Sequence, residues 1–183
     1  MEMLSPEEIV ESFKTALGSD FINSKIYQKE VAIKKNLSTS IWIYVKKEAF
    51  RKAVEHICEL QKYPHLSVIS SSDRGDIIEL IYHFSMYYGH HLKALSLGLR
   101  VDLPKNDSKI PTITDIIPGA IFTERETQEM MGVEVVDIPD SRRLFLPEDF
   151  PEGVYPWRKD ETGPHDMLRV LPGRRGTKGE QNE

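Results

Sequence analysis

Hydrophobic positions near the start of the chain recur at helical spacing. Ser5 can cap a helix, Pro6 suits its first position, and Glu8 completes a capping box. Gly18 can end this helix, because glycine tolerates the left-handed conformation that follows a last helical turn. A second helix is expected over 47–62, before Pro64. The apolar faces of the two helices are Ile9, Val10, Phe13 and Leu17 in the first, and Phe50, Val54, Ile57 and Cys58 in the second.

Alternation of apolar and polar residues predicts five strands between and after these helices. The longest two alternate strictly, which is typical of an antiparallel hairpin with one covered and one solvated face. In the second of them, Ser96, Gly98, Arg100 and Asp102 are expected on the solvated face. The expected strands lie around 31–33 and over 41–45, 66–70, 77–88 and 91–103, with turns at 36–39, 71–76 and 89–90.

The element order αββαβββ indicates an α+β fold, a mixed and mostly antiparallel sheet with helices on one face. We expect it to fill residues 1–110, with a polar linker at 104–109. Beyond it we expect a helical turn at 114–117, a helix over 118–131 that Gly132 ends, and a long irregular arm to residue 168. Residues 169–183 are expected to form a flexible tail.

The irregular arm keeps large apolar side chains although it shows neither helical nor strand period. A segment of this kind cannot bury such residues on itself, so we expect it to lie along another protein. These side chains are Leu144, Phe145, Leu146, Phe150, Tyr155 and Trp157.

Composition excludes several functions. The 183-residue chain has a net charge of −5, which gives no reason to expect a nucleic-acid partner. It holds one cysteine, Cys58, so it cannot supply the four thiolates that an iron–sulfur cluster usually takes. No run approaches the roughly 20 apolar residues of a membrane span, and residues 1–8 do not resemble a secretory signal. We therefore expect a reducing, cytoplasmic compartment and membrane contact only through partners.

No motif for catalysis, nucleotide binding or metal binding stands out. Gly173, Gly176 and Gly179 lie in the tail without the strand and helix of a phosphate loop. His90 and His91 are adjacent at a turn, which is poor spacing for a chelate. We therefore expect no catalytic residue, cofactor or metal ligand in this chain.

Charged residues cluster at three places after residue 120. Glu124, Arg125 and Glu126 lie on the expected helix, close to Glu129; an acid–base site, a solvated face with local ion pairs, and a partner interface are the alternatives, and the interface is favoured. Arg142-Arg143 and Trp157-Arg158-Lys159-Asp160 combine planar cations, aromatic residues and carboxylates, the residue types of binding hot spots. The alternative for both is an ordinary loop with surface ion pairs.

Together these residues resemble the 30-kDa subunit family of complex I, which also occurs in energy-converting hydrogenases. The Glu-Arg-Glu motif with a glycine six residues beyond it, and the Arg-Lys-Asp ending, carry most of the resemblance. The matching positions are Thr112, Asp115, Ile116, Pro118, Ala120, Glu124, Arg125, Glu126, Glu129, Met130, Gly132, Arg142, Arg143, Leu144, Pro156, Arg158, Lys159 and Asp160.

The departures from the respiratory members point to one branch of the family. Ile138-Pro139 replaces a His-Pro pair, Val154-Tyr155-Pro156 replaces Gly-His-Pro, and Phe122 stands where tryptophan is common. The run 145–156 is similar to the archaeal membrane-bound hydrogenase and sulfane-sulfur reductase group, which is ferredoxin-linked.

The resemblance implies a non-catalytic, peripheral subunit on the cytoplasmic face of the cell membrane. It implies that the chain binds a large catalytic subunit, like the 49-kDa subunit or the hydrogenase large subunit, and a small iron–sulfur subunit. Iron–sulfur clusters and a metal site then belong to those partners. Three alternatives remain: the 30-kDa-type subunit of an NADH- or F420-type quinone or phenazine dehydrogenase, a free-standing ferredoxin-docking module, and an independent enzyme using Glu124, Glu126 and Glu129. The expected interface comprises Glu124, Arg125, Glu126, Arg142, Arg143, Trp157, Arg158, Lys159 and Asp160.

Overall fold

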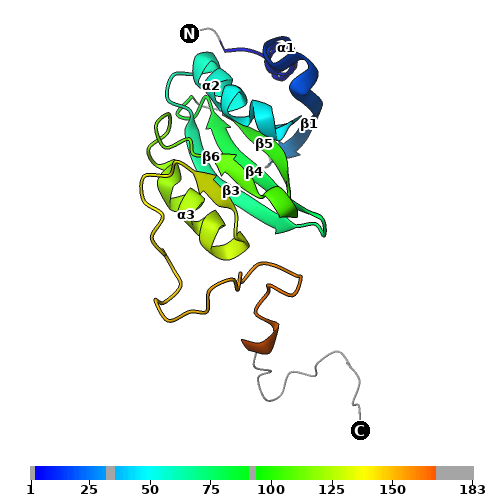
Figure 1. Ribbon diagram of the computed structural model, residues 1–183. Helices are drawn as coiled ribbons and strands as arrows, with labels where there is room; N and C mark the ends of the chain where they lie inside the picture. Colours follow the sequence, from blue (N-terminus) through cyan, green and yellow to red (C-terminus); the bar gives the residue numbers. More distant parts are fainter. Residues whose placement is uncertain (1–2, 32–35, 91–93, 168–183) are drawn as a thin grey trace.

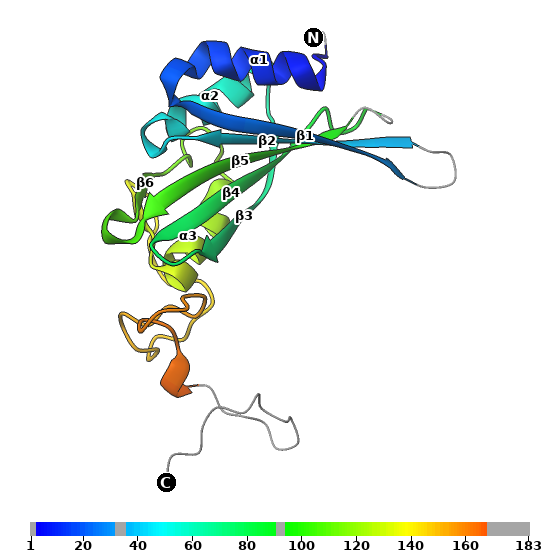
Figure 2. The same ribbon diagram turned by 90° about the vertical axis from the view of Figure 1, so that its right-hand side faces the viewer.

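The computed structural model describes residues 3–31, 36–90 and 94–167. A five-stranded sheet forms its centre, with helices α1 and α2 at one end and helix α3 at the other (Figure 1). The irregular arm continues from α3 away from the first two helices, as Figure 2 also shows.

Helix α1 (Pro6–Leu17) forms as its sequence predicts. Ser5 accepts a hydrogen bond from the Glu8 N–H, and the Glu8 carboxylate accepts one from the Ser5 N–H. The predicted apolar face is buried in the core, and Gly18 ends the helix at a φ of 55°. This prediction is confirmed in full because every signal for the helix is local.

Helix α2 (Phe50–Leu60) follows a 3₁₀ turn, η2 (Lys47–Ala49), and ends two residues earlier than expected. Phe50, Val54 and Ile57 are buried as predicted. Cys58 is only half-buried, at the border of the stripe, and burial raises the pKa of its thiol.

The sheet is mixed and mostly antiparallel, which confirms the predicted fold class. The strand order is β1-β2-β5-β4-β3, and only β2 and β5 pair in parallel. The strands are β1 (Phe21–Val31), β2 (Asn36–Val45), β3 (His65–Asp73), β4 (Ile77–Met86) and β5 (Leu95–Pro104).

The turn predicted at 36–39 and the predicted start of the first strand are wrong, and the turn predicted at 71–76 begins only after Asp73. Asn36 to Thr39, expected as a turn, begins β2 and pairs with β1, which starts at Phe21. Polar residues extend β1 and β2 because their outer part is exposed on both faces and needs no apolar alternation. Ser71 and Ser72 likewise belong to β3 and not to a turn. Strand β5 starts at Leu95, and the expected start at residue 91 lies outside the described residues.

The predicted hairpin of β4 and β5 is confirmed in its pairing and in its covered face. Its alternating apolar residues are buried against the helices, except that Tyr88 lies beyond β4 and is 51% exposed. The opposite face is less solvated than expected, because Gly98 is buried and Arg100 and Asp102 are half-buried. The buried set is Ile78, Leu80, Tyr82, Phe84, Met86, Leu95, Leu97, Leu99, Val101 and Leu103.

The segment after β5 is tied to the sheet domain more closely than a linker would be. The 3₁₀ turn η3 (Lys105–Asp107) leads into β6 (Lys109–Pro111), which pairs in parallel with β7 (Glu134–Val136). The expected boundary at residue 110 therefore falls inside β6. Strand β7 has no predictable pattern because it is only three residues long. The predicted turn near 114–117 is confirmed, and a last 3₁₀ turn, η4 (His165–Met167), lies in the arm.

Candidate partner-docking site

Helix α3 (Ala120–Met131) carries the Glu-Arg-Glu cluster and packs against β3. Gly132 ends it with a φ of 64°, as predicted. Its inward face is Ala120, Glu124, Thr127 and Met131. One member of the predicted interface therefore points into the core.

Glu124 is fully buried, so the expectation that it contacts a partner is wrong. Its carboxylate accepts hydrogen bonds from the Thr112 hydroxyl at 2.6 Å and from the Ile113 N–H at 2.8 Å. Burial raises the pKa of Glu124, while these two hydrogen bonds oppose the rise. Glu124 thus fixes the segment before α3. This role could not be predicted from the sequence, because the hydrogen-bond partners of Glu124 lie 11 and 12 residues earlier in the chain.

Arg125 binds the arm of its own chain. Its Nε and Nη2 atoms donate to the carbonyl oxygens of Arg142 and Arg143, both at 2.8 Å, and Nη1 lies 3.4 Å from the Asp140 carboxylate. Only 12% of its side chain is exposed. The guanidinium fork thus fixes the arm backbone onto α3.

Glu129, one turn further along α3, holds the next part of the arm. Its two carboxylate oxygens accept the N–H groups of Leu144 at 3.2 Å, Phe145 at 2.9 Å and Leu146 at 2.8 Å. Three successive backbone donors on one carboxylate make a strong, charge-assisted anchor. The sequence offered Glu129 as an acid–base candidate or as a member of local ion pairs on a solvated face. It did not predict this anchor, because a carboxylate that binds backbone groups leaves no signature in its partners' side chains.

The double arginine makes contacts within the arm. Arg142 pairs with Asp140 through two hydrogen bonds of 2.9 and 2.8 Å, yet 84% of its side chain is exposed. This pairing holds the pKa of Asp140 well below its usual range. Arg143 donates to the Pro147 carbonyl at 2.7 Å. Both guanidinium groups remain at the surface and keep further donors for a partner.

The C-terminal end of α3 binds residues 157–158 of the arm through its last carbonyl groups. The Trp157 N–H donates to the Met130 carbonyl at 3.0 Å, and the Arg158 Nε donates to the Met131 carbonyl at 2.6 Å. A cation near the last carbonyls complements the helix dipole. Arg158 also lies over the Tyr155 ring, and only 8% of its side chain is exposed.

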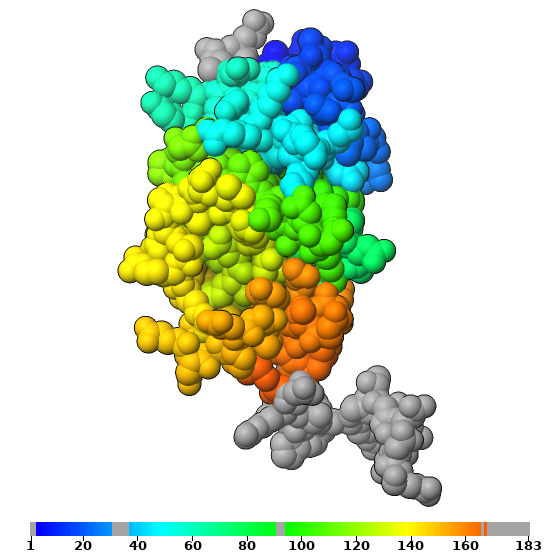
Figure 3. Space-filling view, in the orientation of Figure 1, coloured from blue at the N-terminus to red at the C-terminus, as the bar shows by residue number. Residues whose placement is uncertain are grey.

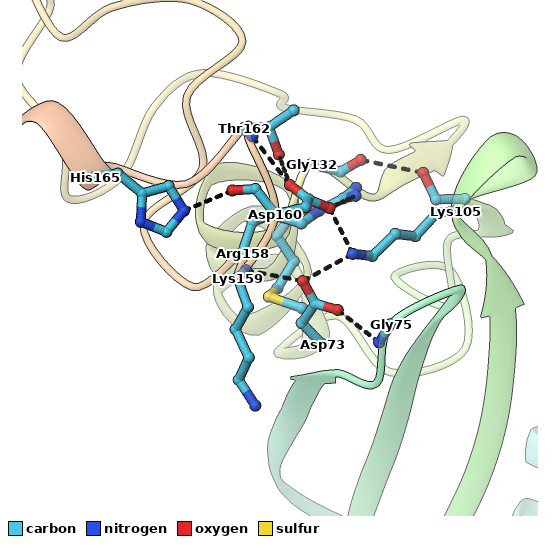
Figure 4. Close-up of polar contacts among 11 residues, drawn as sticks. Asp73, Gly75, Lys105, Gly132, Arg158, Lys159, Asp160, Thr162 and His165 are labelled. Atoms are coloured by element: carbon cyan, nitrogen blue, oxygen red, sulfur yellow. Dashed lines mark hydrogen bonds and ion pairs between the residues drawn. The ribbon is translucent and has the colours of Figure 1, made fainter. Parts of the chain in front are cut away.

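Asp160 joins the arm to the sheet through a lysine. Lys105 bridges Asp160 and Asp73, at the end of β3, with the Asp73 contact at 2.8 Å (Figure 4). Asp73 also accepts the N–H groups of Lys159 at 2.8 Å and Gly75 at 3.0 Å. This Asp73–Lys105–Asp160 junction connects the end of β3, the turn after β5 and the arm through polar contacts.

The charges at this junction shift one another's pKa values. Burial alone would raise the pKa of Asp73, but the Lys105 ammonium and the two N–H donors lower it below its ordinary value. Hydrogen bonds from Lys105 and Thr162 lower the pKa of Asp160 strongly. Burial opposes the charge on Lys105, yet both carboxylates raise its pKa on balance. All three groups therefore stay charged near neutral pH.

Three aromatic side chains of α3 and the arm remain exposed to solvent. Phe122, Phe145 and Trp157 are 60%, 61% and 44% exposed. In Figure 3 the arm, yellow to orange, forms a continuous surface with the end of the molecule that holds α3. Glu126 is half-buried and Lys159 exposed, and neither side chain forms an ion pair within the described ranges. The exposed part of the predicted interface is thus apolar and basic.

Substitution of Gly132 by alanine is expected to loosen the arm. The residue has a φ of +64°, and an added Cβ would lie 2.5 Å from the Tyr155 ring. Strain in the left-handed region alone costs about 1–2 kcal/mol, and displacement of Tyr155 adds to it. Chemical denaturation and protease cleavage within 140–160 measure both effects. Gly119→Ala, where nothing lies within 4 Å, is the control, and an equal effect of the two variants would contradict this account.

The described residues contain neither a cluster of metal ligands nor a membrane-spanning helix. No group of three or more His, Cys, Asp or Glu side chains could hold a metal ion there. In the same ranges no helix is long and apolar enough to cross a membrane.

Comparison with known proteins identifies the family of this chain. A family model, described as the 30 Kd subunit of respiratory-chain NADH dehydrogenase, matches residues 43–166. The chain belongs to this family. The match covers the end of β2, then α2, β3 to β5, α3 and the arm, so it includes the Glu-Arg-Glu and Arg-Lys-Asp motifs that carried the resemblance.

Two relatives illustrate the range of this family. The membrane-bound hydrogenase subunit beta of Pyrococcus furiosus is 34% identical over 159 residues, which is 85% of this chain and 91% of that protein. Formate hydrogenlyase subunit 5 of Escherichia coli is 36% identical over 98 residues, 52% of this chain but only 17% of that protein. The chain therefore matches nearly the whole of one relative and a small part of the other.

A solved structure shares the fold of this family member. A chain of the membrane-bound sulfane sulfur reductase, an archaeal respiratory membrane complex, superposes with a TM-score of 0.69 at 18% identity, covering 97% of this chain and 98% of that chain. The predicted likeness to the hydrogenase and sulfane-sulfur reductase branch is confirmed. This family member is thus similar to subunits of multi-subunit, membrane-bound redox complexes.

Proposed function

We propose that this chain is a non-catalytic scaffold subunit of a ferredoxin-linked, membrane-bound hydrogenase or sulfane-sulfur reductase. In this proposal it holds the large catalytic subunit against the small iron–sulfur subunit. It lies on the cytoplasmic face and reaches the membrane only through these partners. Clusters and metal sites belong to the partners, since one cysteine cannot ligate a cluster.

The observation that carries this proposal is the way the arm is held. Arg125, Glu129 and Arg158 bind mainly backbone groups of the arm or of α3, so the arm has a fixed course without a core of its own. Its aromatic side chains then point outward, which costs free energy unless another surface covers them. Preformed apolar anchors beside exposed arginines are what a stable protein interface requires.

The comparisons support a partner of large size. In formate hydrogenlyase subunit 5 the matching segment belongs to a much longer polypeptide. A domain that is joined to a larger one in some relatives is suited to bind a larger subunit here. The hydrogenase relative and the departures at Ile138 and Tyr155 favour ferredoxin over NADH as the electron source.

Co-purification tests the scaffold role. The double variant Phe145→Ala, Trp157→Ala is expected to reduce recovery of the large and iron–sulfur subunits at least tenfold, because buried aromatic anchors contribute about 2 kcal/mol each. The control Leu37→Ala, Tyr63→Ala removes exposed side chains of similar character far from the arm. Undiminished recovery with a folded double variant would refute the proposal.

A further inference from the structure

Glu124 differs from the other buried carboxylates of the described residues in having no cation beside it. Asp73 and Glu79 are also buried, and each contacts a lysine or arginine at 2.8 or 2.9 Å. Glu124 is 0% exposed, and no positively charged group of the described chain offsets its burial. A buried carboxyl group without a cation favours its neutral form, because no opposite charge compensates for the lost hydration.

The titratable groups that face Glu124 do not supply this positive charge. Tyr82 of β4 is buried, and its burial together with the Glu124 charge keeps the Tyr82 pKa well above its usual range, so it is neutral. Asp115 carries a like charge, and Arg51 of α2 pairs with Asp115 and donates to the Thr112 carbonyl at 3.1 Å. Burial first, and then the Asp115 charge, raise the pKa of Glu124.

Two hydroxyl groups connect the Glu124 carboxylate with the surface. The Thr112 hydroxyl donates to Glu124 Oε2 at 2.6 Å, and it lies 2.9 Å from the Thr114 hydroxyl. Both threonines line a pocket of about 400 Å³. Asp115 and Asp137, which are exposed, lie in the wall of the same pocket, so water reaches it. A hydroxyl both donates and accepts, so two in a row can pass a proton from the pocket to the carboxylate.

We propose that Glu124 is a proton-binding site that exchanges its proton with this surface pocket through Thr112 and Thr114. A hydronium ion in the pocket gives a proton to Thr114 Oγ1 and becomes water. The Thr114 proton moves to Thr112 Oγ1, and the Thr112 proton moves to Glu124 Oε2. Each hydroxyl keeps one proton, and the carboxylate becomes a neutral acid that donates to Thr112. The Ile113 N–H keeps its acceptor, Oε1, throughout, so the proton enters without opening the core.

The proton affects how firmly α3 is held, independently of the proposed function. The folded pKa of Glu124 lies above its ordinary value of 4.5, so the folded chain binds this proton more tightly than the unfolded chain. Ionisation therefore lowers stability as the pH rises from 4.5 through the folded pKa. Glu124 joins α3 to the segment before it, so acidification in this range strengthens the contact that positions α3.

Carbon-13 NMR of the full chain, labelled at the glutamate carboxyl groups, tests this proposal. The Glu124 resonance is the one that Glu124→Gln removes, and we expect it to titrate above 4.5 as one averaged signal. Thr114→Val keeps the shape of the side chain but removes the outer hydroxyl. It should slow proton exchange about 100-fold, so that separate signals of the neutral and ionised forms appear. The control is Thr127→Val, because the buried Thr127 hydroxyl bonds only the Thr123 carbonyl of its own helix.

A second variant tests the site without touching the core. Asp115→Asn, at the exposed wall of the pocket, removes the like charge and should lower the pKa of Glu124. Four outcomes would overturn the proposal: titration of Glu124 at or below 4.5, no change with Asp115→Asn, exchange in Thr114→Val as fast as in the wild type, and equal slowing by Thr127→Val. Because the measurements use the chain without partners, their failure leaves the proposed function untouched.

Discussion

Replacement of Asp73 by asparagine is expected to lower the free energy of unfolding by about 2–3 kcal/mol. Only 1% of the Asp73 side chain is exposed, and its carboxylate meets Lys105 and the Lys159 and Gly75 N–H groups. Removal of one member of a buried ion pair leaves the other charge poorly compensated. Lys105 keeps Asp160 as a partner, so we expect a value at the lower end of such losses. Urea denaturation of the full chain near pH 7 measures the change.

The pH dependence of this effect has a defined sign. The folded pKa of Asp73 lies below its ordinary value of 3.8, so its stabilisation is complete above that value. The stabilisation is lost as the pH falls through the folded pKa, and the difference between wild type and Asp73→Asn should narrow below about pH 4. Asp76→Asn, in the exposed turn before β4, is the control. A similar loss in both variants, or a pH-independent difference, would contradict the role of the junction.

Replacement of Glu129 by alanine is expected to release the arm from α3 without unfolding the sheet. Three backbone N–H groups lose their shared acceptor, and charge-assisted hydrogen bonds contribute about 1.5–3 kcal/mol each before solvent exposure weakens them. A net loss of about 2 kcal/mol makes the open state roughly 30-fold more populated. Limited proteolysis should therefore cut within 140–150 about 30-fold faster, while the denaturation midpoint of the sheet changes little.

Glu126→Ala is the matched control for this release. Glu126 lies on the same helix and carries the same charge, and its side chain forms no hydrogen bond or ion pair with any described residue. It should leave the cleavage rate near that of the wild type. If both variants accelerate cleavage equally, the loss of helix charge explains the result and the Glu129 anchor does not.

The parts of the fold that were predicted correctly share one property. Helix α1 and the hairpin of β4 and β5 are encoded by local signals, a capping box in the first and strict alternation in the second. The parts that were missed depend on neighbours. Residues 36–39 form a strand because β1 lies beside them, and the three residues of β7 do so because β6 does. A polar or very short segment shows no alternation of apolar and polar residues from which a strand could be predicted.

The same distinction applies to the candidate site. The sequence identified the charged clusters, yet it could not tell which charges act within the chain. Glu124 turned inward because one helical face faces the core, and Arg125 found carbonyl groups of the arm. A side chain that binds backbone has partners without any residue signature, so Glu129 was not recognised as an anchor of the arm.

The sequence by itself determined the fold class, the course of the main helices and strands, and the family. These depend on local propensity, hydrophobic period and motif residues, which are all written in the order of amino acids. Only the tertiary structure decided which polar groups are used internally and which surfaces remain. Burial and hydrogen bonding at Glu124, Arg125 and Arg158 depend on segments distant in sequence. What they leave exposed is the aromatic, basic surface of the arm.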